Sequence, residues 1–433
     1  MKVLVIGSGA REHALALALA RDPQVKEVFA APGNPGIAQV ATCLDVAGSG
    51  SDPEAVAALA VRTQVDLVVV GPEAPLVAGV TDAVVARGIP CFGPTARAAR
   101  LESSKAFAKE VMEAAGVPTA RSAVCTTVDA VMEALDHFGA PYVVKDDGLA
   151  AGKGVVVTEE RTKAFAHAVQ CLEREKAPGE DETRVVIEEF LDGPEISLFC
   201  LTDGETVVPL APAQDFKRLG DGGRGPNTGG MGAYTPLDWA PATLTEDVVT
   251  RVAEPTIAEM RRRGTPFAGV LYVGLALTSQ GLRVVEFNAR FGDPETQVVL
   301  ARLRTGLGGV LLAAARGELA DLPPLEWSDD AAVTVVVAAR GYPEAPRKGD
   351  PIVIGDVGEA QILHAGTREG SDSLVTAGGR VLSVVATGPD LAAARKIAYA
   401  AVDAVEIPGS RHRTDIALAA AQNRIALPGQ EQE

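Results

Sequence analysis

The stretch from Glu286 to Gln297 gathers side chains that could bind a metal ion and a phosphate. Glu286 and Asn288 stand two residues apart in a run typical of a β-strand, so both side chains point to the same side. A carboxylate beside an amide carbonyl offers hard oxygen ligands, which Mg²⁺ accepts together with the phosphates of a substrate. Arg290 adds a planar fork for a carboxylate or a phosphate. We interpret the stretch as the floor of an ATP site; the alternative is a buried strand that ends in a charged loop.

Lys145 and the loop after it could contact phosphates. Lys145 ends a predicted strand, and Gly152-Lys153-Gly154 follows in a run of small residues before the next strand. The backbone N–H groups of such a loop can approach phosphates closely while the lysines neutralise their charge. The spacing of a Walker loop is absent, and an ordinary glycine-rich hairpin is the alternative.

Two further segments could surround a ligand. The run from Glu188 to Leu191 is an extended connector that could offer backbone groups to adenine, and Glu195 could accept from ribose hydroxyls. The alternative is an acidic turn between strands. The run from Arg218 to Gly232 has too many glycines to pack by itself, so it is either disordered or, as we expect, closes over a ligand.

The first loop, Gly7 to Glu12, is similar to a dinucleotide fingerprint, but Glu12 replaces the third glycine. The second strand also ends without the carboxylate that binds an adenosine ribose. We therefore expect a smaller phosphate ligand or a tight turn here, and not a nicotinamide cofactor. Glu73 follows another strand, where it could accept ribose hydroxyls or cap a helix.

Alternating strands and helices must position these loops. The pattern up to residue 100 predicts strands at 3–6, 28–31 and 67–70 and helices at 12–21, 53–63 and 77–87, hence a parallel sheet with the loops at its carboxyl edge. A helix is expected over 103–115. The middle of the chain favours strands at 142–145, 154–158, 185–189 and 196–201, with helices near 129–138 and 162–174. The last part favours strands at 332–338, 361–364 and 380–387 and a helix after Asp390.

The bulk properties limit the possible functions. A chain of 433 residues is expected to form two to four domains, and its 47% hydrophobic and 22% charged residues are typical of a soluble globular protein. The net charge of −17 argues against a general affinity for nucleic acid or anionic membrane. The five cysteines lack the spacing of a zinc site. The N-terminus enters a strand directly and no apolar run could span a bilayer, so we expect a cytoplasmic protein.

Together, these residues resemble a known superfamily. The order of Ser104-Lys105, Lys145 with the Gly152-Lys153-Gly154 loop, Glu188 to Glu195, and Glu286-Phe287-Asn288 resembles that of an ATP-grasp ligase. More narrowly, the chain resembles the phosphoribosylamine–glycine ligase family of purine biosynthesis. The segments that carry this resemblance include the first loop, Ala31 to Asn34, Gly71 to Val77, Pro226 to Tyr234, Phe287 to Gln297 and His364 to Thr367.

The resemblance implies an α/β and α+β multidomain fold. A pre-ATP-grasp domain with a parallel sheet, on the phosphoribosylamine side, would span residues 1–102. An ATP-grasp domain would span 103–322, with a small lid at about 120–190, and a C-terminal domain similar to that of biotin carboxylase would span 326–426.

The resemblance also implies a role for each site residue. For ATP, Lys105 and Lys145 would hold the phosphates, Gly152, Lys153 and Gly154 would form the lid loop, Glu188, Glu189 and Leu191 would frame adenine, and Glu195 would bind the ribose. Glu286 and Asn288 would bind Mg²⁺ or Mn²⁺. Gly9, Arg11, Asn34 and Glu73 would lie near phosphoribosylamine. Asp215, Lys217 and Arg290 would be catalytic and, with Gly292, Asp293 and the loop from Pro226 to Gly232, would serve glycine and the acyl intermediate.

The implied activity is an ATP-dependent ligation of glycine to 5-phosphoribosylamine through glycyl phosphate, by a monomer that binds neither nucleic acid nor membrane. Positioning and charge neutralisation suffice for this reaction, so no Ser or Cys nucleophile is required. Rival functions are another ATP-grasp carboxylase or carboxylate–amine ligase, an NAD-dependent oxidoreductase, and a nucleotide sensor without turnover. Two residues depart from the family pattern: Asp146, where Ala is common, and Phe216, where His is common.

Overall fold

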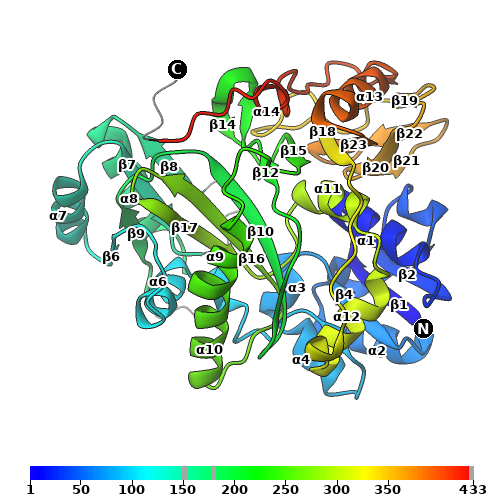
Figure 1. The fold of residues 1–433 in the computed structure, drawn as a ribbon, viewed down its shortest axis with the longest axis horizontal. Helices are drawn as coiled ribbons and strands as arrows, with labels where there is room; N and C mark the ends of the chain where they lie inside the picture. The colour runs from blue at the N-terminus through cyan, green and yellow to red at the C-terminus, as the bar shows by residue number, and fades with distance from the viewer. Residues whose placement is uncertain (149–153, 177–181, 429–433) are drawn as a thin grey trace.

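The N-terminal layer is a five-stranded parallel sheet in the order β3-β2-β1-β4-β5. Figure 1 shows its strands β1, β2 and β4 near the N-terminus, on one side of the molecule. The computed structural model describes residues 1–148, 154–176 and 182–428. The strands are β1 (Lys2–Gly7), β2 (Glu27–Pro32), β3 (Thr42–Cys43), β4 (Leu67–Val70) and β5 (Cys91–Phe92), and the helices are α1 (Ala10–Ala20), α2 (Pro53–Thr63), α3 (Glu73–Ala78), α4 (Val80–Val85) and α5 (Arg100–Ser103). The residues from Val3 to Ile6 are fully buried, as expected for a parallel sheet that is covered on both faces.

A small antiparallel sheet forms a second layer, in the order β6-β9-β7-β8. It consists of β6 (Ser122–Cys125), β7 (Tyr142–Asp146), β8 (Val155–Thr158) and β9 (Val185–Glu188), with the helices α7 (Val128–Phe138) and α8 (Arg161–Glu173). Val131 and Leu135 of α7 pack against Val144 and Ile187 in a hydrophobic core that is separate from the rest of the molecule. This layer therefore has the packing of a small independent unit.

A larger antiparallel sheet lies at the centre, in the order β11-β10-β16-β17. Its strands are β10 (Glu195–Asp203), β11 (Val207–Pro209), β16 (Ala268–Thr278) and β17 (Gly281–Asn288). The helices of this part are α6 (Lys105–Ala114), α9 (Leu244–Val248), α10 (Glu254–Arg262), α11 (Glu295–Arg302) and α12 (Leu307–Arg316), with a π-helical turn at Val249–Ala253. Leu15 of α1 shares one core with Val298 of α11 and Leu311 of α12, so the central part is packed firmly on the N-terminal layer.

The C-terminal sheet, β12-β15-β18-β23-β20, takes strands from two parts of the chain. The middle part contributes β12 (Gln214–Asp215) and β15 (Gly232–Thr235), and the last part contributes β18 (Ala331–Ala338), β20 (Gln361–His364) and β23 (Arg380–Gly388). The remaining elements are β19 (Val353–Ile354), β21 (Thr367–Glu369), β22 (Leu374–Thr376), β24 (Val405–Glu406), α13 (Leu391–Asp403), α14 (Leu418–Ala421) and 3-10 turns at Ile37–Gln39, Ala47–Gly50, Asp221–Gly223 and Leu319–Asp321. None of the helices in the described ranges combines the length and apolar character needed to cross a bilayer.

Two local predictions were wrong. The helix expected over 77–87 is two helices, α3 and α4, because Gly79 has a φ of 93° and serves as the end of one and the start of the other. The run from Arg218 to Gly232 is not one irregular loop. It contains a β-hairpin of β13 (Arg218–Gly220) and β14 (Arg224–Asn227), whose tip uses positive φ angles at Gly222 and Gly223.

Candidate active site

A β-bulge sets the direction of Glu286 and Asn288. Glu286 pairs with Gly274 of β16, and the register shifts at the adjacent pair, so Val285 is one residue more than the partner strand provides. Because of this extra residue, Phe287 lies in the hydrophobic core while Glu286 and Asn288 share the opposite face. The alternation expected from the sequence therefore holds for these two side chains.

Three lysines surround the Glu286 carboxylate. Burial alone would raise the pKa of Glu286, but the positive charges of Lys217, Lys145 and Lys105 lower it below its usual value. Within the described part of the chain, this carboxylate accepts no hydrogen bond and lies in no ion pair closer than 4.0 Å. It is an ionised group that faces cations without contacting them.

The three lysines come from three different segments: Lys105 from α6, Lys145 from β7, and Lys217 from the link between β12 and β13. Lys105 opens α6, and its Nζ donates to the carbonyl oxygen of Gly148 at 3.0 Å. The Nζ of Lys145 donates to the carbonyl oxygen of Val285 at 3.0 Å, which ties β7 to the bulge in β17. Both lysines act electrostatically on Glu286, so the charge near this carboxylate could receive polyphosphate.

The carboxylate of Glu188 forms ion pairs with two lysines in the interior of the protein. Its carboxylate lies 2.7 Å from Nζ of Lys145 and 3.0 Å from Nζ of Lys109, and the side chain is almost completely buried. Lys109 also donates to Thr119 Oγ1 at 2.9 Å and to the carbonyl oxygen of Ala120 at 3.0 Å. The sequence analysis missed Lys109; its position one turn after Lys105 on α6 was the available signal.

The remaining predicted nucleotide residues lie along the connector after β9. Glu189 accepts from the backbone N of Arg121 at 2.8 Å and from its Nε at 2.7 Å. Leu191 is half-buried, and Glu195 pairs with Nζ of Lys217. Gly154 precedes β8, whereas Gly152 and Lys153 lie outside the described residues.

Asp215 and Lys217 lie in a half-buried group of charges. Burial raises the pKa of Asp215 to about 7, although Lys217 opposes the shift. The carboxylates of Glu295, Glu195 and Glu286 raise the pKa of Asp215 further. Burial alone would lower the pKa of Lys217, but Glu195 and Asp215 raise it. The charges of the two predicted catalytic residues therefore influence each other's pKa, and the charge of Glu286 influences both.

Glu295 is held by two hydroxyl groups that the sequence analysis missed. Its Oε1 accepts from Tyr272 at 2.7 Å and from Ser197 at 3.1 Å, and the two hydroxyl groups are 2.8 Å apart. Both residues lie within apolar stretches of their strands, residues 196–201 in β10 and 270–277 in β16. A polar side chain in such a run was the signal that could have identified them.

Arg290 joins the central sheet to the N-terminal layer. Its Nε lies 3.3 Å from Glu73, and its Nη2 lies 3.0 Å from Glu102. Glu102 also accepts from the backbone N of Ala289 at 2.7 Å. Burial would raise the pKa of Glu73, but Arg290 and Arg11 lower it. The structure therefore brings Glu73 and Arg290 together, and it adds Glu102, which sequence reasoning missed.

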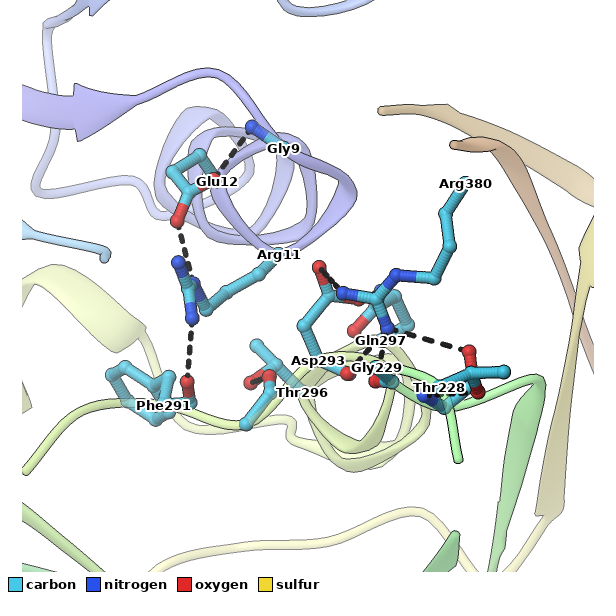
Figure 2. A network of polar contacts seen from close by, with 12 residues as sticks. Gly9, Arg11, Glu12, Thr228, Gly229, Phe291, Asp293, Thr296, Gln297 and Arg380 are labelled. Atoms are coloured by element: carbon cyan, nitrogen blue, oxygen red, sulfur yellow. Dashed lines mark hydrogen bonds and ion pairs between the residues drawn. The ribbon is translucent and has the colours of Figure 1, made fainter. Parts of the chain in front are cut away.

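The first loop is closed by Glu12 (Figure 2). One carboxylate oxygen accepts from the backbone N of Gly9 at 2.6 Å, and the other accepts from Nε of Arg11 at 2.5 Å. A Cβ at Gly7 or at Gly71 would overlap the side chain of Glu12. The carboxylate thus fills the place that a phosphate takes at the start of a fingerprint helix.

Asn34 and Arg11 tie this loop to distant segments. Nδ2 of Asn34 donates to the carbonyl oxygens of Ser8 at 2.8 Å and His364 at 2.9 Å, and its Oδ1 accepts from two backbone N–H groups of its own turn. Arg11 Nη1 donates to the carbonyl oxygen of Phe291 at 3.1 Å. All four hydrogen-bonding positions of the Asn34 amide are therefore occupied by the protein.

Asp293 receives two side chains in the turn before α11. Its Oδ2 lies 3.0 Å from Nη2 of Arg380, and its Oδ1 accepts from Nε2 of Gln297 at 2.7 Å (Figure 2). Burial would raise the pKa of Asp293, but Arg380 and Arg11 lower it. The preceding Gly292 leaves room for Glu295, since a Cβ there would lie 2.5 Å from the Glu295 carboxylate. Sequence reasoning missed Arg380.

The two departures from the family pattern have local partners. Asp146 pairs with Nε of Arg174 at 3.0 Å. The ring of Phe216 lies under the guanidinium of Arg413, whose Cζ is 4.8 Å from the ring centroid, and 6.1 Å from the ring of Tyr234. Both side chains are therefore accounted for by contacts with neighbouring side chains.

Three family profiles match the chain in sequence. They are described as the N domain, the ATP-grasp (A) domain and the C domain of phosphoribosylglycinamide synthetase, and they match residues 1–102, 103–296 and 332–419. A relative from Streptomyces coelicolor, named phosphoribosylamine–glycine ligase, is 64% identical over 97% of this chain and 100% of its own length.

Solved structures are similar over nearly the whole chain. A phosphoribosylamine–glycine ligase from Thermotoga maritima has a TM-score of 0.83 at 35% identity, over 96% of this chain and 100% of the other. A biotin carboxylase from Campylobacter jejuni has a TM-score of 0.71 at 16% identity, over 98% of this chain and 95% of the other. The second likeness concerns the fold alone.

Proposed function

Because the chain belongs to the phosphoribosylamine–glycine ligase family, we propose that it activates glycine as glycyl phosphate on the face of β17 that carries Glu286. The activity is the ATP-dependent ligation of glycine to 5-phosphoribosylamine, which forms glycinamide ribonucleotide in purine biosynthesis. The observation that carries the proposal is the ionised Glu286 carboxylate, which faces three lysines and is hydrogen-bonded to none of them.

The proposed reaction has two displacement steps. An oxygen of the glycine carboxylate attacks the γ-phosphorus of ATP, and the bond to the β–γ bridging oxygen breaks, which releases ADP. The nitrogen of phosphoribosylamine then attacks the acyl carbon, and phosphate leaves with the glycine oxygen as the amine loses a proton. Both steps depend on alignment and on neutralised charge, which the protein supplies through fixed lysines and arginines.

The residues present fit a divalent metal ion. Across the described ranges, no group of three or more His, Cys, Asp or Glu side chains could enclose a metal by itself. Mg²⁺ is commonly held by one or two protein oxygens together with substrate phosphates, and Glu286 and Asn288 offer such oxygens on one face. We propose Mg²⁺ or Mn²⁺ at this pair; the bound ion would neutralise charge on the phosphates.

Lys105 and Lys145 are the proposed phosphate ligands, and Gly152, Lys153 and Gly154 are proposed to form the lid loop, as the family resemblance implies. Glu189 and Leu191 would lie beside adenine and Glu195 beside the ribose. The buried ion pairs of Glu188 support a different task from the one implied by family resemblance. We propose that Glu188 fixes Lys145 for the phosphates and takes no part in holding adenine by its carboxylate.

Glycine and its acyl phosphate are proposed to lie between Asp215, Lys217, Arg290 and the turn of Gly292 and Asp293. Arg290 is a fork that could hold a carboxylate, and its ion pairs with Glu73 and Glu102 fix its orientation. Phosphoribosylamine is proposed to approach from the side of Gly9, Arg11 and Glu73. The hydrogen bonds of Asn34 support a structural task at that edge.

We keep the boundaries 1–102, 103–322 and 326–426 as proposed domains, with a lid at about 120–190, although β12 and β15 complete the C-terminal sheet. A monomer in the cytoplasm remains the proposed form of the enzyme. Sedimentation velocity at micromolar concentration would test the monomer, and a dimer would refute it.

The experiment for the proposed function is phosphate release with ATP, glycine and freshly generated phosphoribosylamine, each omitted in turn. We expect release to require all three components and to stop when bicarbonate replaces glycine. Phosphate release that depends on bicarbonate and proceeds without glycine would overturn the proposal in favour of a carboxylase. Binding of ATP without turnover in any mixture would favour a nucleotide sensor.

A further inference from the structure

A single arginine of the C-terminal sheet contacts both the turn of Asp293 and the glycine-rich loop at Gly229 and Gly230. Arg380 is the first residue of β23. Its Nη2 pairs with the Asp293 carboxylate at 3.0 Å, and its Nη1 donates to the carbonyl oxygen of Asp293 at 2.7 Å. The same Nη1 donates to the carbonyl oxygens of Gly229 and Gly230. Figure 2 shows the guanidinium between the turn and the glycine-rich loop.

The glycine-rich loop extends this contact to Lys217. The backbone N and the Oγ1 of Thr228 both donate to the carbonyl oxygen of Lys217, at 2.7 and 2.8 Å. Oγ1 of Thr228 also accepts from the backbone N of Gly230 at 3.0 Å. A continuous series of hydrogen bonds therefore joins the segment of Lys217, the loop, Arg380 and the turn of Asp293.

The backbone around Arg380 is shaped for this contact. A Cβ at Gly229 would lie 2.9 Å from Cζ of Arg380, and a Cβ at Gly230, where φ is +107°, would overlap Pro294. The hydroxyl of Tyr342 accepts from the backbone N of Gly229 at 3.0 Å, so the C-terminal part holds the loop at a second point. The guanidinium is mostly shielded from solvent, and charge-assisted hydrogen bonds are strong in such surroundings.

This geometry points to Arg380 as a positioning residue for the ligation. It holds the Lys217 segment and the Asp293 turn at a fixed separation, so that glycyl phosphate and the attacking amine meet between them. The inference rests on the roles proposed above for Lys217 and Asp293. Arg380 contacts neither Lys105 nor Lys145, so its removal should affect glycine and the amine and not the nucleotide.

The test compares Arg380→Ala and Arg380→Lys with Arg368→Ala. Arg368 is an exposed residue of β21, and among the described residues its guanidinium donates only to the neighbouring carbonyl of Glu369. For each protein, the KM values for glycine, phosphoribosylamine and ATP are measured together with the ratio of ADP to glycinamide ribonucleotide formed. The proposal predicts a higher KM for glycine, an ADP ratio above one as glycyl phosphate is lost to water, and product formation lowered on the order of 10²-fold. The KM for ATP should stay within about twofold of wild type, and Arg368→Ala should behave as wild type.

Arg380→Lys keeps the positive charge but cannot donate to all four acceptors, so it carries the test if Arg380→Ala does not fold. Wild-type glycine KM and ADP ratio in folded Arg380→Lys and Arg380→Ala would overturn the inference. An ATP KM that rises as much as the glycine KM would also overturn it, because a general loosening of the fold would then explain the defect.

A double-mutant cycle with Asp293→Asn separates this inference from the proposed function. If Arg380 acts through Asp293, the effects of Arg380→Lys and Asp293→Asn on the glycine KM are not additive, whereas additivity overturns the inference. A defective Asp293→Asn beside a normal Arg380→Lys refutes the inference alone. A normal Asp293→Asn refutes the proposed role of Asp293 and the inference that rests on it.

Discussion

The face of β17 and the loop after β1 are both rich in buried charge, but their charges are satisfied differently. At β17, Glu286 is ionised and surrounded by lysines, yet no described residue donates a hydrogen bond to its carboxylate. At the first loop, Glu12 is in contact with both Gly9 and Arg11, and Asn34 uses its whole amide in hydrogen bonds to backbone groups. Buried polar groups in proteins are normally paired, so the two regions are expected to have different tasks.

This difference suggests which charges bind a ligand and which stabilise the fold. The charges around Glu286 could be completed by polyphosphate and a metal ion, whereas those around Glu12 are already complete. Substitution of Glu286 should therefore affect turnover more than stability, and substitution of Glu12 should do the reverse. Four predictions test this contrast.

The largest effect is expected for Glu286→Gln. The amide keeps the shape of the side chain but removes the negative charge proposed to bind the metal, so kcat/KM should fall on the order of 10³-fold while the fold is kept. Steady-state assays at saturating Mg²⁺ and circular dichroism provide the measurement. Glu246→Gln, at an exposed position of α9, is the control. Near-normal turnover of Glu286→Gln would contradict the contrast.

Lys145 and Lys109 allow a matched comparison because both pair with Glu188. Lys145→Met should lower kcat/KM for ATP on the order of 10²-fold, since Lys145 also faces Glu286. Lys109→Met should mainly lower the free energy of unfolding, by about 3 kcal/mol, because it leaves buried groups without a partner. ATP kinetics and urea unfolding of both variants give the answer. Equal losses of kcat/KM in Lys145→Met and Lys109→Met would show that the two lysines do not have different tasks.

Glu12→Gln should affect stability and leave the chemistry nearly intact. It removes the charge that pairs with Arg11 in a buried position, so the free energy of unfolding should fall by about 2 kcal/mol. Urea denaturation measures this effect, and kcat/KM at a temperature where the variant is folded should stay within about threefold of wild type. A large loss of kcat/KM with unchanged stability would place Glu12 in the reactive region.

At neutral pH the smallest effect is expected at His13, which acts on the pH dependence of stability. Burial and the nearby His364 lower the pKa of His13 to about 3, so the folded protein stays unprotonated there while the unfolded chain takes up a proton below pH 6.5. The contribution of His13 to the free energy of unfolding is fully present above pH 6.5. It is lost as the pH falls towards 3, by up to about 1.4 kcal/mol per pH unit. His13→Asn should make the slope of stability between pH 4.5 and 6.5 shallower by about one proton. Urea titrations across this range test it, with His137→Asn at an exposed position as the control.

Much of the fold could be predicted from local patterns. The strands at Leu67–Val70 and Gln361–His364 were predicted with the bounds that the structure has. For Leu67–Val70 the reason is clear, because a short run of apolar residues between Asp66 and Gly71 leaves little choice. The hairpin after Arg218 was missed, since its glycines signal only an unusual backbone and not which strands they connect.

The site was predictable where it depends on one segment. Glu286 and Asn288 share a face because side chains alternate along a strand. The lysines near them were predicted from the order of the motifs along the chain. The bulge at Val285 depends on how β17 pairs with β16, and the position of the Arg380 guanidinium depends on tertiary contacts. Spacing in the sequence carries no signal for either of them. The roles of individual residues remain predictions.

The most direct test of the central claim follows the oxygen atoms of glycine. Glycine labelled with ¹⁸O in its carboxylate is incubated with the enzyme, ATP and phosphoribosylamine, and the released phosphate is analysed by mass spectrometry. If glycyl phosphate forms, each phosphate released with product carries one oxygen from glycine, and Glu286→Gln releases almost none. Unlabelled phosphate at normal product yield would contradict the account.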